Sequence, residues 1–109
     1  MFAIEDLIDS IHHDLIRITD HADEEAHSET MTFEEIFTSV LYGEVIEEYP
    51  KDRPFPSCLV FGMNMKREPI HSVWGYNVEN RWAVLITVYR PDPTKWIEWK
   101  IRRNKDDAL

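Results

Sequence analysis

The sequence predicts an α+β fold in which N-terminal helices pack on one face of a four-stranded antiparallel sheet. Up to Leu41, apolar residues recur at spacings of three and four, and after Gly43 they alternate with polar residues. Short links that contain Pro, Gly or Asn separate the alternating segments, as in an antiparallel meander. With 109 residues, 43% of them hydrophobic, the chain suits a single domain, 1–109, with a modest core.

The first third of the chain carries the weaker helix signals. Residues 3–14 form an amphipathic pattern, because Ile4, Leu7, Ile8, Ile11 and Leu15 recur at helical spacing. Residues 15–19, "LIRIT", alternate and fit either a short strand or the end of that helix. Residues 20–29 predict a weak helix with Asp20 as its N-cap.

The helix predicted over 33–42 has the strongest end signals. Thr32 and Glu35 form a capping box, in which each side chain can bond to the other residue's backbone N–H. Gly43 follows the last apolar position and suits the end of a helix.

Period-two segments then predict four strands joined by short links. These strands are 44–49, 57–63, 70–77 and 82–89. After them, Asp92 and Pro93 suit the N-cap and first position of a short helix. The alternation of Ile97, Trp99 and Ile101 favours a last edge strand instead, so 93–103 stays open between the two.

Charge is distributed unevenly along the chain. The net charge is −9, which by itself argues against nucleic-acid binding. Residues 1–49 contain 14 Asp and Glu against one Arg, whereas residues 50–109 contain 7 acidic and 11 basic residues. A phosphate-binding surface in the second half is therefore possible if the halves face different directions; otherwise both simply have solvated charged faces.

Composition also indicates a compartment. The single cysteine, Cys58, excludes an internal disulfide and a cysteine-only metal cage. No apolar run approaches 18 residues, and the N-terminus lacks the pattern of a signal peptide. We therefore expect a cytoplasmic protein without a membrane segment.

A series of short motifs resembles a known family. The series runs "ITDHA" (18–22), "GEVIEEYP" (43–50), "PSCLVFG" (56–62), "PIHSVW" (69–74) and "ITVYRPDP" (86–93). As a set it is similar to a bacterial family of small uncharacterised domains grouped with the RelE/ParE toxin superfamily. The resemblance implies a RelE-like core over 16–103, preceded by a helix (1–15) and followed by a frayed tail (104–109).

The resemblance also implies an activity. RelE-type members cut messenger RNA, often on the ribosome, and ParE-type members act on DNA gyrase. The chain departs from the pattern in two ways: Glu24 and Glu25 stand where many relatives have an arginine, and the chain is acidic where RelE-type ribonucleases are usually basic.

RNA cleavage without metal needs a base for the 2′-hydroxyl, an acid for the leaving oxygen and a cation for the phosphate. The predicted catalytic residues are His71, Arg90, Tyr89 and His21, and the predicted substrate-binding residues are Lys95, Arg102, Arg103 and Trp96. We expect His71 on the open sheet face with a pKa near its ordinary value, or else half-buried and bonded to a neighbour. Arg90, held in extended geometry by Pro91, suits either a phosphate or a structural ion pair.

Several other candidates have structural interpretations. Tyr89 suits a role as acid or base-stacking residue, or a plain aromatic of the sheet. The four tryptophans suit either a stacking platform or core and interface positions. Glu24 and His27 make one E-x-x-H, too little for a two-metal carboxylate site, so we predict no metal and no cofactor.

Three functions compete on these grounds. The first is a RelE-like endoribonuclease toxin whose antitoxin covers the basic face, with RNA or the ribosome as target. The second is a non-enzymatic module that binds protein through tryptophans, and the third is a ParE-like inhibitor of a protein target. Convergence of His71, Arg90 and Arg102 or Arg103 on one cleft favours the first. Burial of Arg90 against Glu47 or Glu48 favours the second. The oligomeric state is not indicated.

Overall fold

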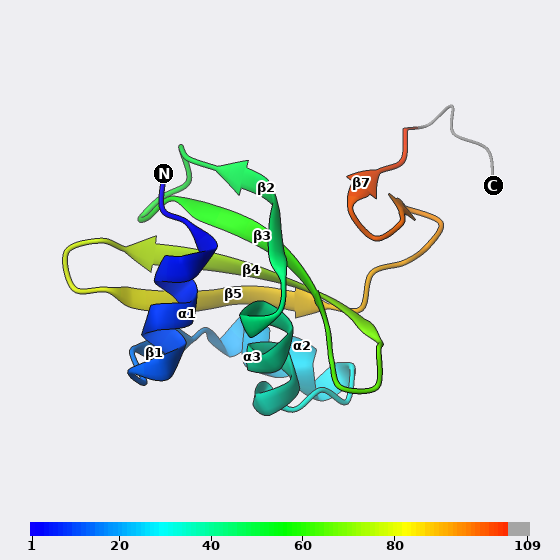
Figure 1. Ribbon diagram of the computed structural model, residues 1–109, viewed down its shortest axis with the longest axis horizontal. Coiled ribbons are helices and arrows are strands. Elements are labelled where there is room, and N and C mark those ends of the chain that lie inside the picture. The colour runs from blue at the N-terminus through cyan, green and yellow to red at the C-terminus, as the bar shows by residue number, and fades with distance from the viewer. Residues whose placement is uncertain (105–109) are drawn as a thin grey trace.

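The computed structural model describes residues 1–104 and confirms the α+β class (Figure 1). The three helices in this part of the chain lie against one side of a sheet. They are α1 (Ile4–His12), α2 (Asp20–Ser28) and α3 (Phe33–Leu41). The tail predicted at 104–109 lies, apart from Asn104, outside the described residues.

The larger sheet has five strands in the order β1-β5-β4-β3-β2. Its strands are β1 (Ile16–Ile18), β2 (Glu44–Tyr49), β3 (Ser57–Met63), β4 (Pro69–Asn77) and β5 (Trp82–Tyr89). The four strands expected after Gly43 form the antiparallel meander β2 to β5. The predicted four-stranded antiparallel sheet is nevertheless wrong, because β1 adds a fifth strand parallel to β5.

The pairing of β1 has a simple physical reason. Ile16 and Ile18 pack against the core, while Arg17 between them is exposed. Their backbone continues the edge of β5, with the Ala83 N–H donating to the Leu15 carbonyl over 2.9 Å. The alternation in residues 15–19 therefore marks a strand, whose partner lies more than sixty residues away in the sequence.

One predicted helix start is confirmed and another is corrected. At α3 both hydrogen bonds of the capping box between Thr32 and Glu35 are present. At α2 the N-cap is Thr19 rather than Asp20, because the Thr19 hydroxyl accepts the Ala22 N–H over 3.0 Å. Ala22 is fully buried, so α2 packs closely on the sheet.

The core lies between the helices and one sheet face. Trp74 and Tyr76 of β4 point to this side, where Trp74 meets Phe37 of α3. Gly62 permits the contact between α3 and β3, since a Cβ there would lie 1.7 Å from the Ser39 carbonyl oxygen. Alternate residues of β4, including His71, therefore point to the opposite side, called here the open face.

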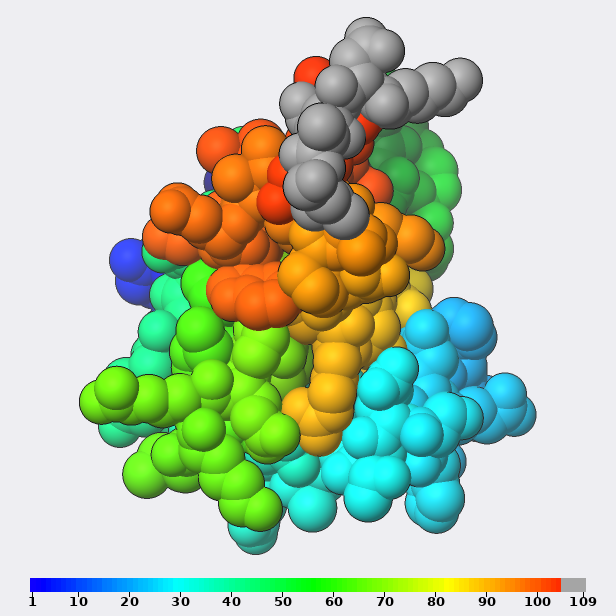
Figure 2. Space-filling model, turned by 90° about the vertical axis from the view of Figure 1, so that its right-hand side faces the viewer, coloured from blue at the N-terminus to red at the C-terminus, as the bar shows by residue number. Residues whose placement is uncertain are grey.

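The chain then crosses to the open face. Residues 93–104, called here the C-terminal segment, contain the two-stranded hairpin of β6 (Trp96–Ile97) and β7 (Ile101–Arg102). They contain neither the short helix expected at Pro93 nor a further edge strand of the larger sheet. Figure 2 shows this segment in orange and red above the green strands. Among residues 1–104, none of the helices has the length and apolar character needed to cross a membrane.

Candidate functional site

The strand register places three aromatic side chains in a row on the open face. His71 is paired with Phe61 of β3 on one side and with Tyr89 of β5 on the other. Trp96 from the C-terminal segment lies over this row, with its ring centroid 4.5 Å from that of His71. As a result His71 is fully buried, not exposed on the open face as one sequence interpretation had it.

The hydrogen bonds of His71 define its tautomer. Its Nε2 lies 2.6 Å from the Trp99 carbonyl oxygen, which can only accept, so Nε2 carries the proton. Its Nδ1 is then an acceptor, and the Tyr89 hydroxyl lies 3.1 Å away as its donor. The Nδ1 lone pair of the imidazole therefore accepts the Tyr89 hydroxyl proton.

Burial shifts both groups toward their neutral forms. It lowers the pKa of His71 below its ordinary value, against the opposing effects of the Trp99 carbonyl and the Glu47 carboxylate. Burial also raises the pKa of the Tyr89 hydroxyl. Near neutral pH the shared proton consequently resides on Tyr89, and His71 is an uncharged base behind it.

Tyr89 faces a pocket of about 390 Å³, called here the cationic pocket. Three basic side chains surround it, from the end of β5 and from the C-terminal segment. The lining residues are Tyr89, Arg90, Asp92, Lys95, Trp96 and Arg102. Within residues 1–104, Lys95 makes no ion pair within 4 Å, and the Asp92 carboxylate shares the pocket with it.

Arg102 is held firmly at one wall of the pocket. Its guanidinium donates twice to the Glu47 carboxylate, over 2.8 and 3.1 Å, and lies 4.8 Å from the centre of the Trp96 ring. Glu47 also accepts the Tyr49 hydroxyl proton. Burial opposes ionisation of Glu47, but these two hydrogen bonds hold its pKa below the usual range.

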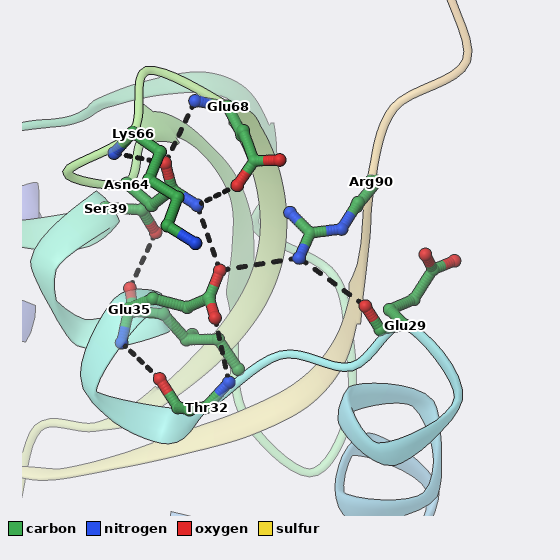
Figure 3. A network of polar contacts seen from close by, with 9 residues as sticks. Glu29, Thr32, Glu35, Ser39, Asn64, Lys66, Glu68 and Arg90 are labelled. Atoms are coloured by element: carbon green, nitrogen blue, oxygen red, sulfur yellow. Dashed lines mark hydrogen bonds and ion pairs between the residues drawn. The ribbon is translucent and has the colours of Figure 1, made fainter.

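Arg90 is held loosely at the other wall (Figure 3). One guanidinium nitrogen, Nη2, lies 3.4 Å from the Glu29 carbonyl oxygen and 3.5 Å from the Glu35 carboxylate. The other, Nη1, is buried and has no hydrogen-bond partner within the described part of the chain. Arg90 is therefore paired with the first half of the chain, but through Glu35 instead of Glu47 or Glu48.

The Glu35 carboxylate is shared among several donors. It accepts the Thr32 backbone N–H and the Asn64 amide, each over 3.0 Å, besides the long contact to Arg90. Burial raises its pKa, but the hydrogen bonds from Thr32 and Asn64 and the charge of Arg90 together lower it below the usual value. Arg90 thus competes for an acceptor that is already satisfied.

Two predicted residues lie outside the cationic pocket. Arg103 donates from Nε to the Pro93 carbonyl over 3.1 Å and so holds the C-terminal segment together. His21 lies on α2, with its Nε2 3.2 Å from the Glu25 carboxylate oxygen Oε1. It lines a neighbouring pocket that Tyr89 also lines. The structure therefore brings together His71, Tyr89, Arg90, Lys95, Trp96 and Arg102, but not His21 or Arg103.

The four tryptophans do not share one face. Trp74 is fully buried on the helix side, and Trp96, within the C-terminal segment, is 4% exposed where it packs on His71. Trp82 and Trp99 are half-buried at separate places. A single tryptophan platform, the basis of the protein-binding interpretation, is therefore absent from residues 1–104.

Sequence reasoning missed two parts of the site. It did not anticipate Glu47 as the partner of Arg102, because strand parity from Val45 points Glu47 to the core side and only the register shift between Val45 and Glu47 turns it to the open face. It could not have found the acceptor at Trp99, because a backbone carbonyl leaves no residue-type signal. Within residues 1–104 no three His, Cys, Asp or Glu side chains are grouped to hold a metal ion.

Comparison with known proteins identifies one family. The family model described as "Domain of unknown function (DUF4258)" matches residues 18–90. No curated protein and no solved structure matches the chain. The matched region includes α2, α3 and β2 to β5 with His71, Tyr89 and Arg90, and it ends before the C-terminal segment. The match spans more than half of the chain's residues, so the chain belongs to this DUF4258 family.

Proposed function

We propose that the protein is a RelE-like, metal-independent endoribonuclease that cleaves RNA at the cationic pocket. One observation carries the proposal: the Tyr89 hydroxyl lines a pocket with three basic side chains and is bonded to a buried, neutral histidine. The motif series that resembles the RelE/ParE superfamily supports the same activity. In that setting the protein acts as a toxin on messenger RNA and has a cognate antitoxin.

The proposed reaction begins with proton transfer through Tyr89. The 2′-hydroxyl of RNA gives its proton to the Tyr89 oxygen, while the Tyr89 proton passes to Nδ1 of His71. The Trp99 carbonyl keeps the other nitrogen protonated and favours the imidazolium that results. The 2′-oxygen then bonds to phosphorus.

Cations complete the reaction. Arg90 borders the pocket and supplies donors to the charge that gathers on the phosphate oxygens once its guanidinium turns from the long contacts with Glu29 and Glu35. Lys95 gives a proton to the 5′-oxygen as its bond to phosphorus breaks. The products are a 2′,3′-cyclic phosphate and a free 5′-hydroxyl, and solvent then takes the extra proton from His71 and returns a proton to Lys95.

The test is RNA cleavage by Tyr89→Phe, which loses only the hydroxyl. We expect the cleavage rate to fall about 10²-fold or more, because a positioned proton-transfer group contributes roughly that factor. Wild-type cleavage should persist in EDTA and leave a cyclic phosphate. Induction of wild type in a bacterial host should arrest growth, and Tyr89→Phe should relieve the arrest.

Tyr42→Phe is the matched control, because Tyr42 is 82% exposed and outside the pocket. Thermal melts of both variants check folding. Cleavage by Tyr89→Phe at the wild-type rate, or complete loss of wild-type cleavage in EDTA, would reject the proposal.

A specific observation favours the non-enzymatic module as a second candidate. Arg90 and Arg102 each have a carboxylate partner, Glu35 and Glu47, within the chain. Arginines paired in this way suit a structural role. A folded wild-type protein that binds a protein partner and leaves RNA intact would favour this candidate.

A further inference from the structure

A second pocket on the open face combines aromatic rings with hydrogen-bond donors. Its volume is about 260 Å³, and it lies at the opposite end of β5 from Tyr89. We call it the aromatic–amide pocket. Its lining residues are Arg17, Phe55, Asn77, Asn80, Trp82 and Val84. Its volume falls just below the roughly 300 Å³ at which pockets for drug-sized ligands begin, so it suits a single flat ring system.

The two aromatic rings leave a place for such a ring. Phe55 comes from the loop after β2, and Trp82 begins β5; both are half-buried. No ring contact joins them in the part of the chain that the structure describes. A flat ligand that enters the pocket can therefore stack on either ring, and each stacked nucleobase typically contributes substantially to affinity.

The polar groups of the pocket are donors. The side-chain oxygen of Asn77 accepts the Glu79 N–H and that of Asn80 accepts the Trp82 N–H, each over 3.1 Å. These bonds fix the amide orientations and leave both NH₂ groups without a partner within residues 1–104. Arg17 likewise makes no ion pair or side-chain hydrogen bond in this region.

A pocket of donors matches a base edge that presents only acceptors. Guanine offers two adjacent acceptors, O6 and N7, and arginine binds that edge with two hydrogen bonds. Adenine presents a donor, its amino group, beside N7, and cytosine presents its amino group. The donor set of Arg17, Asn77 and Asn80 therefore fits the O6 and N7 edge of guanine better than the edges of adenine or cytosine.

We propose that the aromatic–amide pocket is a base-binding subsite that prefers guanine in an RNA strand bound across the open face. The inference rests on the proposed function and deepens it by naming what the RNA must carry. Trp82 and Tyr89 are seven residues apart on one strand, so the two pockets are about 20 Å apart. The guanine accordingly lies several nucleotides from the cleaved bond.

The experiment measures binding in Tyr89→Phe protein, in which cleavage is suppressed. Fluorescence anisotropy compares two labelled oligonucleotides that differ only in one guanine replaced by adenine. We expect the guanine oligonucleotide to bind about tenfold more tightly, the size of one good bidentate contact. Adding Arg17→Gln should abolish this preference. Adding Trp82→Ala should weaken the binding of both oligonucleotides about tenfold.

Two controls separate this subsite from general charge and from misfolding. Arg67→Gln removes an equal charge from an exposed turn outside both pockets and should keep the preference. Trp82→Phe retains an aromatic ring and should restore most of the affinity lost in Trp82→Ala.

The outcomes also separate the two proposals. The subsite proposal is overturned if both oligonucleotides bind equally, or if Arg17→Gln and Arg67→Gln change the guanine preference equally. Neither result contradicts Tyr89-dependent cleavage. If the protein prefers guanine but the wild type cleaves no RNA, the ribonuclease proposal is overturned and the subsite proposal stands. Absence of RNA binding overturns the subsite and leaves the open face to a protein partner.

Discussion

The two arginines that flank the cationic pocket differ in how their charge is satisfied. Arg102 makes two short hydrogen bonds to Glu47 and stacks on Trp96, whereas Arg90 makes two long contacts through one nitrogen. Glu47 has Arg102 as its principal partner, but Glu35 bonds first to Thr32 and Asn64. The presence of a carboxylate within ion-pair distance therefore does not show how many hydrogen bonds a guanidinium can still donate.

This difference assigns separate tasks to the two residues. Arg102 fastens the C-terminal segment to β2 and so keeps Trp96 over His71. Arg90 keeps a buried nitrogen without a partner in the described structure, which is costly unless a ligand supplies an acceptor. We infer that Arg90 is the arginine that contacts the phosphate, and that Arg102 shapes the site around it.

The largest expected effect concerns activity. Arg90→Gln should lower the RNA cleavage rate about 10²-fold, the usual cost of removing one donor to a transition-state oxygen. The free energy of unfolding should change little, because the native contacts of Arg90 are long. Steady-state cleavage and thermal melting measure the two quantities.

Arg67→Gln again serves as the charge-matched control for Arg90→Gln, with wild-type cleavage expected. Glu35→Gln should act in the opposite direction and strengthen RNA binding a fewfold, since Gln preserves the capping box but releases Arg90. If Arg102→Gln, in a folded protein, loses more activity than Arg90→Gln, the assignment of tasks is reversed.

A smaller effect is expected on stability. Arg102→Gln should lower the free energy of unfolding by about 1 kcal/mol, from the exposed ion pair with Glu47 and the stacking on Trp96. Hydrogen exchange should accelerate in the C-terminal segment before it does in β4.

Lys100→Gln is a control within that segment, because its ion pair with Glu44 joins two exposed side chains. We expect it to change stability by less than about 0.5 kcal/mol. Equal exchange rates in Arg102→Gln and wild type would show that Arg102 does not fasten the segment.

The smallest expected effect is on the acid dependence of stability. The folded-state pKa of Glu35 and of Glu47 lies below the ordinary value of 4.5, so each carboxylate stabilises the fold above that pH. This contribution is lost as pH falls below 4.5 through the folded pKa, because the unfolded state binds more protons there. Urea unfolding at several pH values measures the loss.

Arg102→Gln should reduce the loss of unfolding free energy on acidification more than Arg90→Gln does. Hydrogen bonding from Arg102 is the main cause that lowers the pKa of Glu47, whereas Arg90 ranks behind Thr32 and Asn64 for Glu35. A larger reduction in Arg90→Gln would contradict the comparison. Burial lowers the folded-state pKa of His71 below 6.5, so a further loss of stability begins as the pH falls below that value, where the unfolded state binds the proton first.

Sequence patterns predicted well those helices and strands whose formation depends on residues close by in the sequence. The capping box at Thr32 and the meander from Glu44 to Tyr89 depend on neighbours within a few residues, and both are confirmed. The strand at Ile16–Ile18 was left open, because its partner on β5 is distant and no local pattern names it. The five-stranded mixed sheet follows from that one pairing.

The candidate site was predicted in part for the same reason. The residue types named His71, Tyr89 and Arg90 as candidates but left open whether they converge, and the structure brings them together. The burial of His71 was not anticipated, because it depends on how the C-terminal segment folds back. Asp92 does bond to the Thr94 N–H as an N-cap would, yet no helix follows in the described residues.

The end of the family match at Arg90 has a consequence for how this site can change over time. His71 and Tyr89, the proposed proton-transfer pair, lie inside the matched region, whereas Lys95, Trp96 and Arg102 lie beyond it. The proposed site is thus assembled from two stretches of the gene, one inside the family match and one beyond it. A change in the C-terminal segment alone would alter the proposed proton donor Lys95 and the cover over His71, while the matched residues stay the same.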